Sequence, residues 1–93
     1  MSSASPIPDY HLTPHAIREL QRRALDEATI RSVLALPEQR FAVRKGREIL
    51  QSRMMLLGKE YLVRVFVDTD RKPPEVVTAY RTSKVRKYWR RDG

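Results

Sequence analysis

The sequence predicts an α+β fold in which two N-terminal helices pack on a four-stranded antiparallel sheet and a basic helix follows at the C-terminus. The first 36 residues carry apolar side chains three and four positions apart, which is the spacing of amphipathic helices. Residues 40–81 change to an alternation of period two, which is typical of half-buried strands. A chain of 93 residues has room for one domain. We place that domain at 10–93 and expect a disordered leader at 1–9.

Two capping residues predict where the N-terminal helices begin. Thr13 precedes Pro14, and a threonine cap followed by proline at the first helical position is a favourable helix start. We expect this first helix over residues 14–23. Asp26 is the cap of a second helix, over 27–36, which ends before a proline.

Four strands are expected, at 40–44, 48–57, 60–68 and 75–81. The third strand is the clearest, because its alternate residues form one wholly apolar face: Tyr61, Val63, Val65 and Val67. We expect this face to be buried against the two helices, with Leu62, Arg64 and Phe66 on the opposite face. Gly58 and Lys59 are predicted to form a two-residue type II′ loop between the second and third strands.

The last predicted element is a helix at 84–90 with Ser83 as its cap. Helical spacing places Val85, Tyr88 and Trp89 on one side of it. The other side carries only cations: Arg86, Lys87, Arg90 and Arg91.

Charge is the feature that most narrows the class of partner. The chain has 19 Lys and Arg against 11 Asp and Glu, a net charge of +8, and its pI is near 10.4. Residues 47–93 hold twelve of these cations and six of the acids, so most of the excess lies in the second half. This balance favours an anionic partner such as a nucleic acid.

Other features exclude several classes of protein. The absence of cysteine excludes disulfides, thiolate zinc sites and a cysteine nucleophile. No apolar run reaches the roughly 18–20 residues of a membrane span, and residues 1–8 lack the layout of a signal peptide. We therefore expect a cytoplasmic protein with no membrane partner.

The two histidines do not predict a metal site. His11 and His15 have the i, i+4 spacing of a helical zinc pair, but the helix start at Thr13 lies between them. No further His or Cys completes a ligand set, so we expect no metal. His15, in the first helical turn, is a candidate general base. The alternative is a partly buried residue that makes one hydrogen bond.

A second group of candidate residues lies where the last strand meets the last helix. Arg81 and Lys84 supply positive charge and donors there, and the first N–H groups of a helix favour an anion. Tyr80 and Tyr88 supply hydroxyls and stacking surface. A phosphodiester suits all of these groups. The alternative is that Tyr88 and Trp89 are core anchors of the last helix.

These residues also carry a resemblance. The stretch from Val76 to Lys84, continued by Lys87-Tyr88-Trp89 and preceded by a helix with His15-Ala16, resembles a family of short microbial proteins grouped with the BrnT and RelE-like toxins of type II toxin–antitoxin systems. The similarity covers nearly all of residues 10–90. It implies a toxin-like fold, an RNA target that includes ribosome-bound mRNA, and an acidic or DNA-binding antitoxin as partner. The positions that match the family motif are His15, Tyr80, Arg81, Lys84 and Lys87.

The resemblance implies a metal-free RNA endonuclease that needs no cofactor. His15 or a neutral Lys84 would take the proton of the 2′-hydroxyl. Arg81 would stabilise the phosphorane together with Arg64, which we add from the face of the third strand and not from the family motif. Tyr80 or a lysine would protonate the leaving oxygen. The residues expected to bind RNA are Arg86, Lys87, Tyr88 and Arg90. Two alternatives stay open: a non-enzymatic nucleic-acid-binding module, and a toxin that inhibits a protein target such as gyrase.

Overall fold

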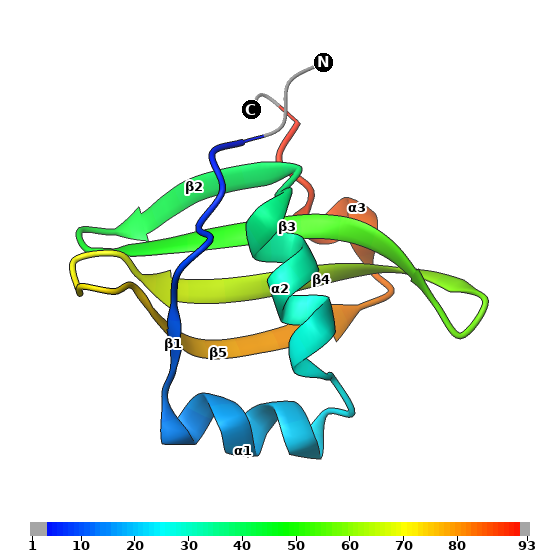
Figure 1. Ribbon diagram of the computed structural model, residues 1–93. Helices are drawn as coiled ribbons and strands as arrows, with labels where there is room; N and C mark the ends of the chain where they lie inside the picture. Colours follow the sequence, from blue (N-terminus) through cyan, green and yellow to red (C-terminus); the bar gives the residue numbers. More distant parts are fainter. Residues whose placement is uncertain (1–3, 92–93) are drawn as a thin grey trace.

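The computed structural model describes residues 4–91, which form a five-stranded mixed sheet with helices on both of its faces (Figure 1). The elements are β1 (His11–Leu12), α1 (Pro14–Arg22), α2 (Glu27–Ala35), β2 (Gln39–Arg44), β3 (Arg47–Leu56), β4 (Lys59–Asp68), β5 (Glu75–Thr82) and α3 (Val85–Tyr88). The strand order is β1-β5-β4-β3-β2. The predicted α+β class is confirmed. The sheet differs from the predicted four-stranded antiparallel one: β2 to β5 pair antiparallel, but β1 is an additional strand that pairs in parallel with β5.

The two predicted helix starts are confirmed by their caps. The Thr13 hydroxyl oxygen accepts a hydrogen bond from the backbone N–H of Ala16 at 3.0 Å. The Asp26 carboxylate accepts one from the N–H of Thr29 at 2.9 Å. These bonds satisfy N–H groups that have no partner within the helix, so each helix begins where its cap stands.

The main core lies between the sheet and the first two helices. In Figure 1, α2 crosses in front of β3 and β4, and α1 lies along β5 at the lower edge. We call this side of the sheet the helix face. Its fully buried strand residues are Leu50, Val63, Val65, Val67, Val76 and Ala79. Burial of each valine side chain stabilises the fold by about 1.5 kcal/mol or more.

The expected apolar face of β4 is confirmed for its three valines, whereas Tyr61 is only half-buried. The other face of β4 is covered as well, since Leu62 is fully buried and Arg64 is 8% exposed. The cover is the C-terminal segment, residues 83–91, whose helix α3 contacts β4 and lies behind the sheet in Figure 1. Both faces of this sheet are therefore packed.

The predicted C-terminal helix is shorter than expected, because it ends at Tyr88 rather than at residue 90. Trp89 has extended backbone, with ψ at 128°. Ser83 does not cap the helix; Lys84 occupies that position and makes no side-chain cap bond. The backbone of residues 88–90 instead bonds to glutamine side chains of the sheet, which are described below.

The β3–β4 turn also differs from the prediction. The two loop residues are Leu57 and Gly58, with φ at 54° and 77°, so the turn is type I′ and glycine comes second. Leu57 is 91% exposed. β3 and β4 therefore pair from Leu56↔Lys59 onward. A Gly58-Lys59 loop would have shifted the register of the two strands by two residues.

The N-terminal segment is packed, which corrects the expected disordered leader for residues 4–9. Ile7 is 5% exposed and belongs to the main core. Its backbone N–H donates to the carbonyl of Leu34 at 2.8 Å, and the N–H of Ala4 donates to the carbonyl of Pro37 at 3.0 Å. Residues 1–3 of the predicted leader lie outside the described residues. Within residues 4–91, no helix is long and apolar enough to cross a membrane.

Ile7→Ala tests this packing. We expect it to lower the free energy of unfolding by about 2 kcal/mol or more, because a buried isoleucine is replaced by a cavity. Ile17→Ala is the matched control, since Ile17 is 43% exposed and its loss should cost about 0.5 kcal/mol. Urea unfolding followed by circular dichroism measures both. Equal, small losses for the two variants would show that the segment does not pack on the core.

Candidate functional site

A row of four polar side chains crosses the sheet on the face opposite α1 and α2. The register pairs Gln39 with Gln51, Gln51 with Arg64, and Arg64 with Tyr80, so β2 to β5 each contribute one residue. Directly paired residues project from the same face of a sheet. We call Gln39, Gln51, Arg64 and Tyr80 the polar row.

The polar row is hydrogen-bonded from end to end. Arg64 Nη1 donates to the Tyr80 hydroxyl at 2.7 Å, and Arg64 Nε donates to Gln51 Oε1 at 2.8 Å. Gln51 Nε2 then donates to Gln39 Oε1 at 2.7 Å. Each amide oxygen thus faces a donor, which fixes the orientation of both glutamines.

The polar row also holds the C-terminal segment. Gln51 Nε2 donates to the carbonyl of Tyr88 at 3.2 Å. The backbone N–H of Arg90 donates to Gln39 Oε1 at 3.0 Å, and Gln39 Nε2 donates back to the carbonyl of Arg90. These bonds replace helical ones, which explains why the helix ends at Tyr88.

Three successive residues of the C-terminal segment stack on side chains of the sheet. In each stack an arginine guanidinium covers an aromatic ring, an arrangement that contributes about 0.5–2 kcal/mol. The stacks, with the distance from guanidinium carbon to ring centroid, are Arg64–Tyr88 at 4.5 Å, Arg53–Trp89 at 4.2 Å and Arg90–Phe41 at 4.3 Å. The segment is therefore an ordered cover of this face, and not a solvated basic tail.

Arg64 is the unusual member of this site. It is a buried cation, and no ion pair within residues 4–91 includes it. Its hydrogen-bond partners are neutral oxygens, and the rings of Tyr80 and Phe66 lie 5.7 and 5.8 Å from its guanidinium carbon. A buried charge is normally compensated by an opposite charge, because its desolvation is costly. The site therefore favours an anion beside Arg64.

The guanidinium of Arg64 also retains donors for such an anion. An arginine has five N–H bonds, and the two contacts above use only Nε and Nη1. In the part of the chain that the structure describes, no buried side-chain nitrogen or oxygen lacks a hydrogen-bond partner. Nη2 makes no hydrogen bond to another described residue and so keeps its two N–H donors. The Tyr80 oxygen accepts from Arg64, so its own proton is free to be donated.

The other predicted catalytic residues do not lie with Arg64 and Tyr80. Arg81 pairs with Val63 and projects from the helix face, where its guanidinium carbon lies 5.0 Å from the ring of Tyr61. Its separation from Tyr80 follows from the alternation of side chains along a strand. The sequence analysis assigned Tyr80 and Arg81 to one site because they are adjacent in the chain. In the strand, their side chains project from opposite faces of the sheet.

His15 and Lys84 lie at opposite ends of β5. His15 is exposed in the first turn of α1, which begins beside the first half of β5, where the N–H of Thr13 donates to the carbonyl of Val76. Lys84 is exposed just after the end of that strand. Figure 1 shows α1 beginning at the left of the sheet and β5 ending at the right. The structure thus does not bring the predicted base His15 to Lys84 or to the polar row.

The predicted RNA-binding cations are all exposed. They are Arg86, Lys87 and Arg90, and they belong to the C-terminal segment. Lys84, which was predicted to be catalytic, and Arg91 are further exposed cations of this segment, and none of the five forms an ion pair with another described residue. Tyr88 is half-buried, with its ring between Arg64 and the Nζ of Lys87, which lies 5.4 Å from the ring centroid. The C-terminal segment, whose backbone is bonded to Gln39 and Gln51 of the polar row, therefore carries five exposed cations.

Sequence reasoning missed the two glutamines and the support of Trp89. The Glu38 carboxylate accepts hydrogen bonds from Nε and Nη2 of Arg53, each at 3.0 Å. Its Oε1 also accepts a hydrogen bond from the backbone N–H of Arg53 at 2.8 Å. This clamp holds Arg53 against the indole ring. The sequence feature that pointed to the polar row is Gln51, a polar residue next to apolar residues in a predicted strand. The structure buries it fully. Within residues 4–91, no three His, Cys, Asp or Glu side chains form a cluster that would hold a metal ion.

No family of known proteins matches the chain, and neither does any curated protein or solved structure. The resemblance to BrnT and RelE-like toxins therefore stays a prediction.

The Glu38–Arg53 clamp predicts a local response to acid. The hydrogen bonds from Arg53 hold the pKa of the Glu38 carboxyl below its ordinary value of 4.5. A carboxyl whose pKa is lowered by folding stabilises the fold above its unfolded pKa, and that contribution is lost as pH falls through the folded value. Trp89 is the only tryptophan, so its fluorescence should change below pH 4.5 as Arg53 is released.

Glu38→Gln separates this event from global unfolding. Hydrogen bonds to arginine also lower the pKa of Glu48 and of Asp68, so circular dichroism must report whether the whole fold is lost in the same range. In Glu38→Gln the fluorescence step that precedes unfolding should disappear. The same step at the same pH in parent and variant would assign it to another carboxylate.

Proposed function

We propose that the protein is a BrnT/RelE-like toxin that cleaves RNA without a metal, and that Arg64 and Tyr80 are its reacting pair. The observation that carries the proposal is a buried guanidinium that has no carboxylate partner within residues 4–91 and contacts a phenol at 2.7 Å. The C-terminal segment, which carries exposed cations, contacts this pair through Tyr88, whose ring lies 4.5 Å from the guanidinium carbon of Arg64. Together these groups suit a phosphodiester better than a neutral ligand.

The chemistry of the pair fits RNA cleavage by attack of the 2′-oxygen on the neighbouring phosphorus. That attack forms the P–O2′ bond and breaks the P–O5′ bond, with the 2′-proton passing to solvent or to a lysine of the C-terminal segment. Arg64 donates to the phosphorane oxygens, where negative charge develops. Tyr80 gives its proton to the leaving 5′-oxygen and regains one from solvent. The proposal thus replaces Arg81 and His15 by groups that lie on one face.

The partner and the location belong to the same proposal. A net charge of +8 is complementary to an acidic antitoxin, and the toxin acts in the cytoplasm, where mRNA and ribosomes are found.

A second function is a nucleic-acid-binding module without cleavage. One observation favours it: no His, Asp or Glu belongs to the polar row, and the exposed His15 is on α1, so the row itself holds no carboxylate or imidazole that could act as a general base. The same cations serve both functions. A cleavage assay separates them.

Tyr80→Phe is the sharpest test of catalysis, because it removes one hydroxyl and keeps the ring. We expect cleavage of single-stranded RNA in EDTA to fall by about 10²-fold or more, since a donor to the leaving group is lost. Arg81→Ala is the control, because Arg81 lies on the other face, and its rate should stay within about threefold of the parent. Both naked RNA and ribosome-bound mRNA are assayed.

Three results would count against the catalytic pair. These are a Tyr80→Phe protein as active as the parent, an Arg81→Ala protein that loses activity equally, and cleavage that EDTA abolishes. If the parent cuts neither form of RNA, the binding module replaces the nuclease.

The salt dependence of RNA binding tests the positive surface. A protein that neutralises phosphates of single-stranded RNA shows a slope of log K against log salt of about −0.7 for each phosphate. Arg86→Ala with Lys87→Ala should make that slope shallower by about 1.4 and weaken binding. Arg18→Ala with Lys45→Ala removes the same charge from exposed positions elsewhere and should leave the slope unchanged. If the two double variants behave alike, the contact is not at the C-terminal segment.

A further inference from the structure

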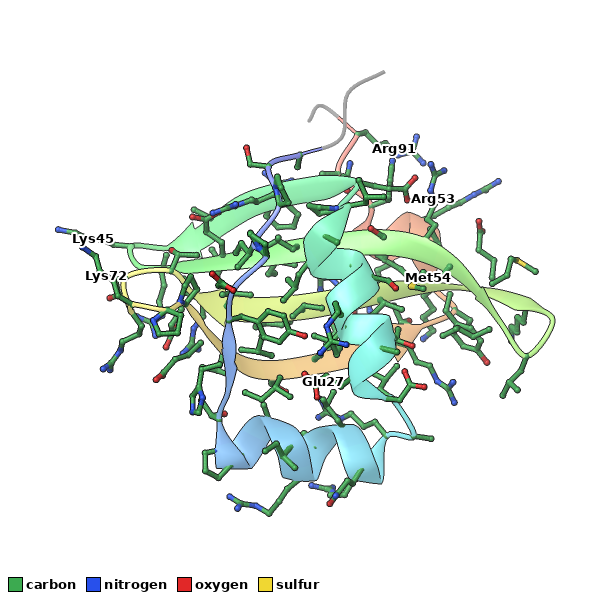
Figure 2. The ribbon with its side chains drawn as sticks, viewed as in Figure 1. Glu27, Lys45, Arg53, Met54, Lys72 and Arg91 are labelled. Atoms are coloured by element: carbon green, nitrogen blue, oxygen red, sulfur yellow. The ribbon has the colours of Figure 1, made fainter. Side chains whose placement is uncertain are left out.

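Beside the polar row, a shallow groove runs between the β3–β4 hairpin and the C-terminal segment. Its lining residues are Arg53, Glu60, Val85, Arg86, Trp89 and Arg91. Figure 2 shows Arg53 and Arg91 at the same end of the molecule, at its upper right. The groove takes its surface from both the sheet and the C-terminal segment, so it exists only because that segment covers this face.

One wall of the groove is a preformed stacking platform. The guanidinium carbon of Arg53 lies 4.2 Å from the centre of the Trp89 ring. The two hydrogen bonds from Arg53 to Glu38 keep that guanidinium from turning away. Unpaired RNA bases stack on aromatic rings and on arginine planes, and a platform that is already fixed loses little entropy on binding.

The other informative residue is Glu60, the one acid of the lining. It is exposed and forms no ion pair within residues 4–91, although three arginines line the same groove. Its carboxylate lies close enough to Arg53 to add to the rise in the pKa of Arg53, which is caused mainly by the hydrogen bond to Glu38. A carboxylate only accepts hydrogen bonds, so Glu60 selects a ligand that offers donors.

Among the four RNA bases, guanine matches this requirement best. Its Watson–Crick edge presents N1–H and an N2 amino group side by side, and these can bond to the two oxygens of one carboxylate. Adenine and cytosine present an amino group next to a ring acceptor, and that acceptor would face the carboxylate. Uracil presents one N–H between two carbonyl oxygens, which the carboxylate would repel.

We propose that this groove binds an unpaired guanine of the RNA, stacked on Trp89 and Arg53 and bonded at its Watson–Crick edge by Glu60. The inference rests on the proposed function, since it assumes that RNA lies along the C-terminal segment. It adds a base preference to a surface whose cations recognise only phosphate. Arg86 and Arg91, from the same groove, bind the phosphates that flank the guanine.

The test uses the 93-residue chain and four fluorescently labelled RNA oligomers. Each is a run of uridines with G, A, C or U at the central position, and binding is measured by fluorescence anisotropy at fixed salt. We expect the oligomer with guanine to bind about tenfold or more tightly than the other three. Glu60→Gln should abolish that preference, because an amide offers one acceptor and one donor. Affinity for the all-uridine oligomer should rise slightly, since a negative charge that faces the RNA is lost.

Two further variants complete the experiment. Asp9→Asn removes another exposed negative charge, which does not line the groove, so it should raise affinity for all oligomers slightly and keep the preference for guanine. Trp89→Leu should weaken the binding of the guanine oligomer by about tenfold, since a stacked base is lost.

The outcomes distinguish this inference from the proposed function. If the parent binds none of the oligomers, the proposed RNA target itself is wrong. If it binds all four with equal affinity, or if Glu60→Gln keeps the preference for guanine, the base site is overturned and the RNA target stands.

Discussion

The buried guanidinium of Arg64 is the constraint on which this side of the molecule depends. A cation at 8% exposure needs hydrogen-bond acceptors, and the sheet supplies two of them through its register, Gln51 on one neighbouring strand and Tyr80 on the other. A shift of one strand would remove an acceptor and leave the charge unsatisfied, which costs about 1–3 kcal/mol or more. The polar row thus specifies the pairing of β2 to β5, while the apolar core on the helix face supplies most of the stability.

The two faces of the sheet consequently have different structural roles. The helix face is closed by α1 and α2 over aliphatic residues, and a fold of this size needs that core for its stability. The opposite face is covered by a short segment that is held through side chains: glutamine amides bond its backbone, and guanidinium groups stack on its rings. Such a cover leaves donors and aromatic edges at the surface, which a second layer of long helices would bury. This division explains how a small domain accommodates both a complete core and a charged site.

The sequence predicts the elements well and their register poorly. The caps at Thr13 and Asp26 fix the helix starts because a side chain next to the helix satisfies its N–H groups, and the valines of β4 show their buried face by strict alternation. The expected Gly58-Lys59 turn, however, would have placed Arg53 opposite Arg64 instead of Gln51. That error is two residues, so every side chain keeps its face and the burial pattern cannot reveal it. At the turn, the two registers differ in the backbone conformation of Leu57, which lies in the left-handed region that few non-glycine residues adopt.

The end of α3 shows why the candidate site itself could not be predicted. Helical periodicity puts Val85, Tyr88 and Trp89 on one side, and continued helix would have turned all three toward the sheet. Instead, Gln51 donates a hydrogen bond to the carbonyl of Tyr88, and Gln39 accepts one from the N–H of Arg90. The backbone therefore becomes extended at Trp89. Extended backbone sends successive side chains in different directions, and this carries Tyr88 to Arg64 and Trp89 to Arg53. A hydrogen bond between a side chain and a backbone group far away in the sequence produces no periodic pattern of residues. The cover over Arg64 and the groove at Trp89 both depend on such hydrogen bonds, so neither could be predicted from the sequence.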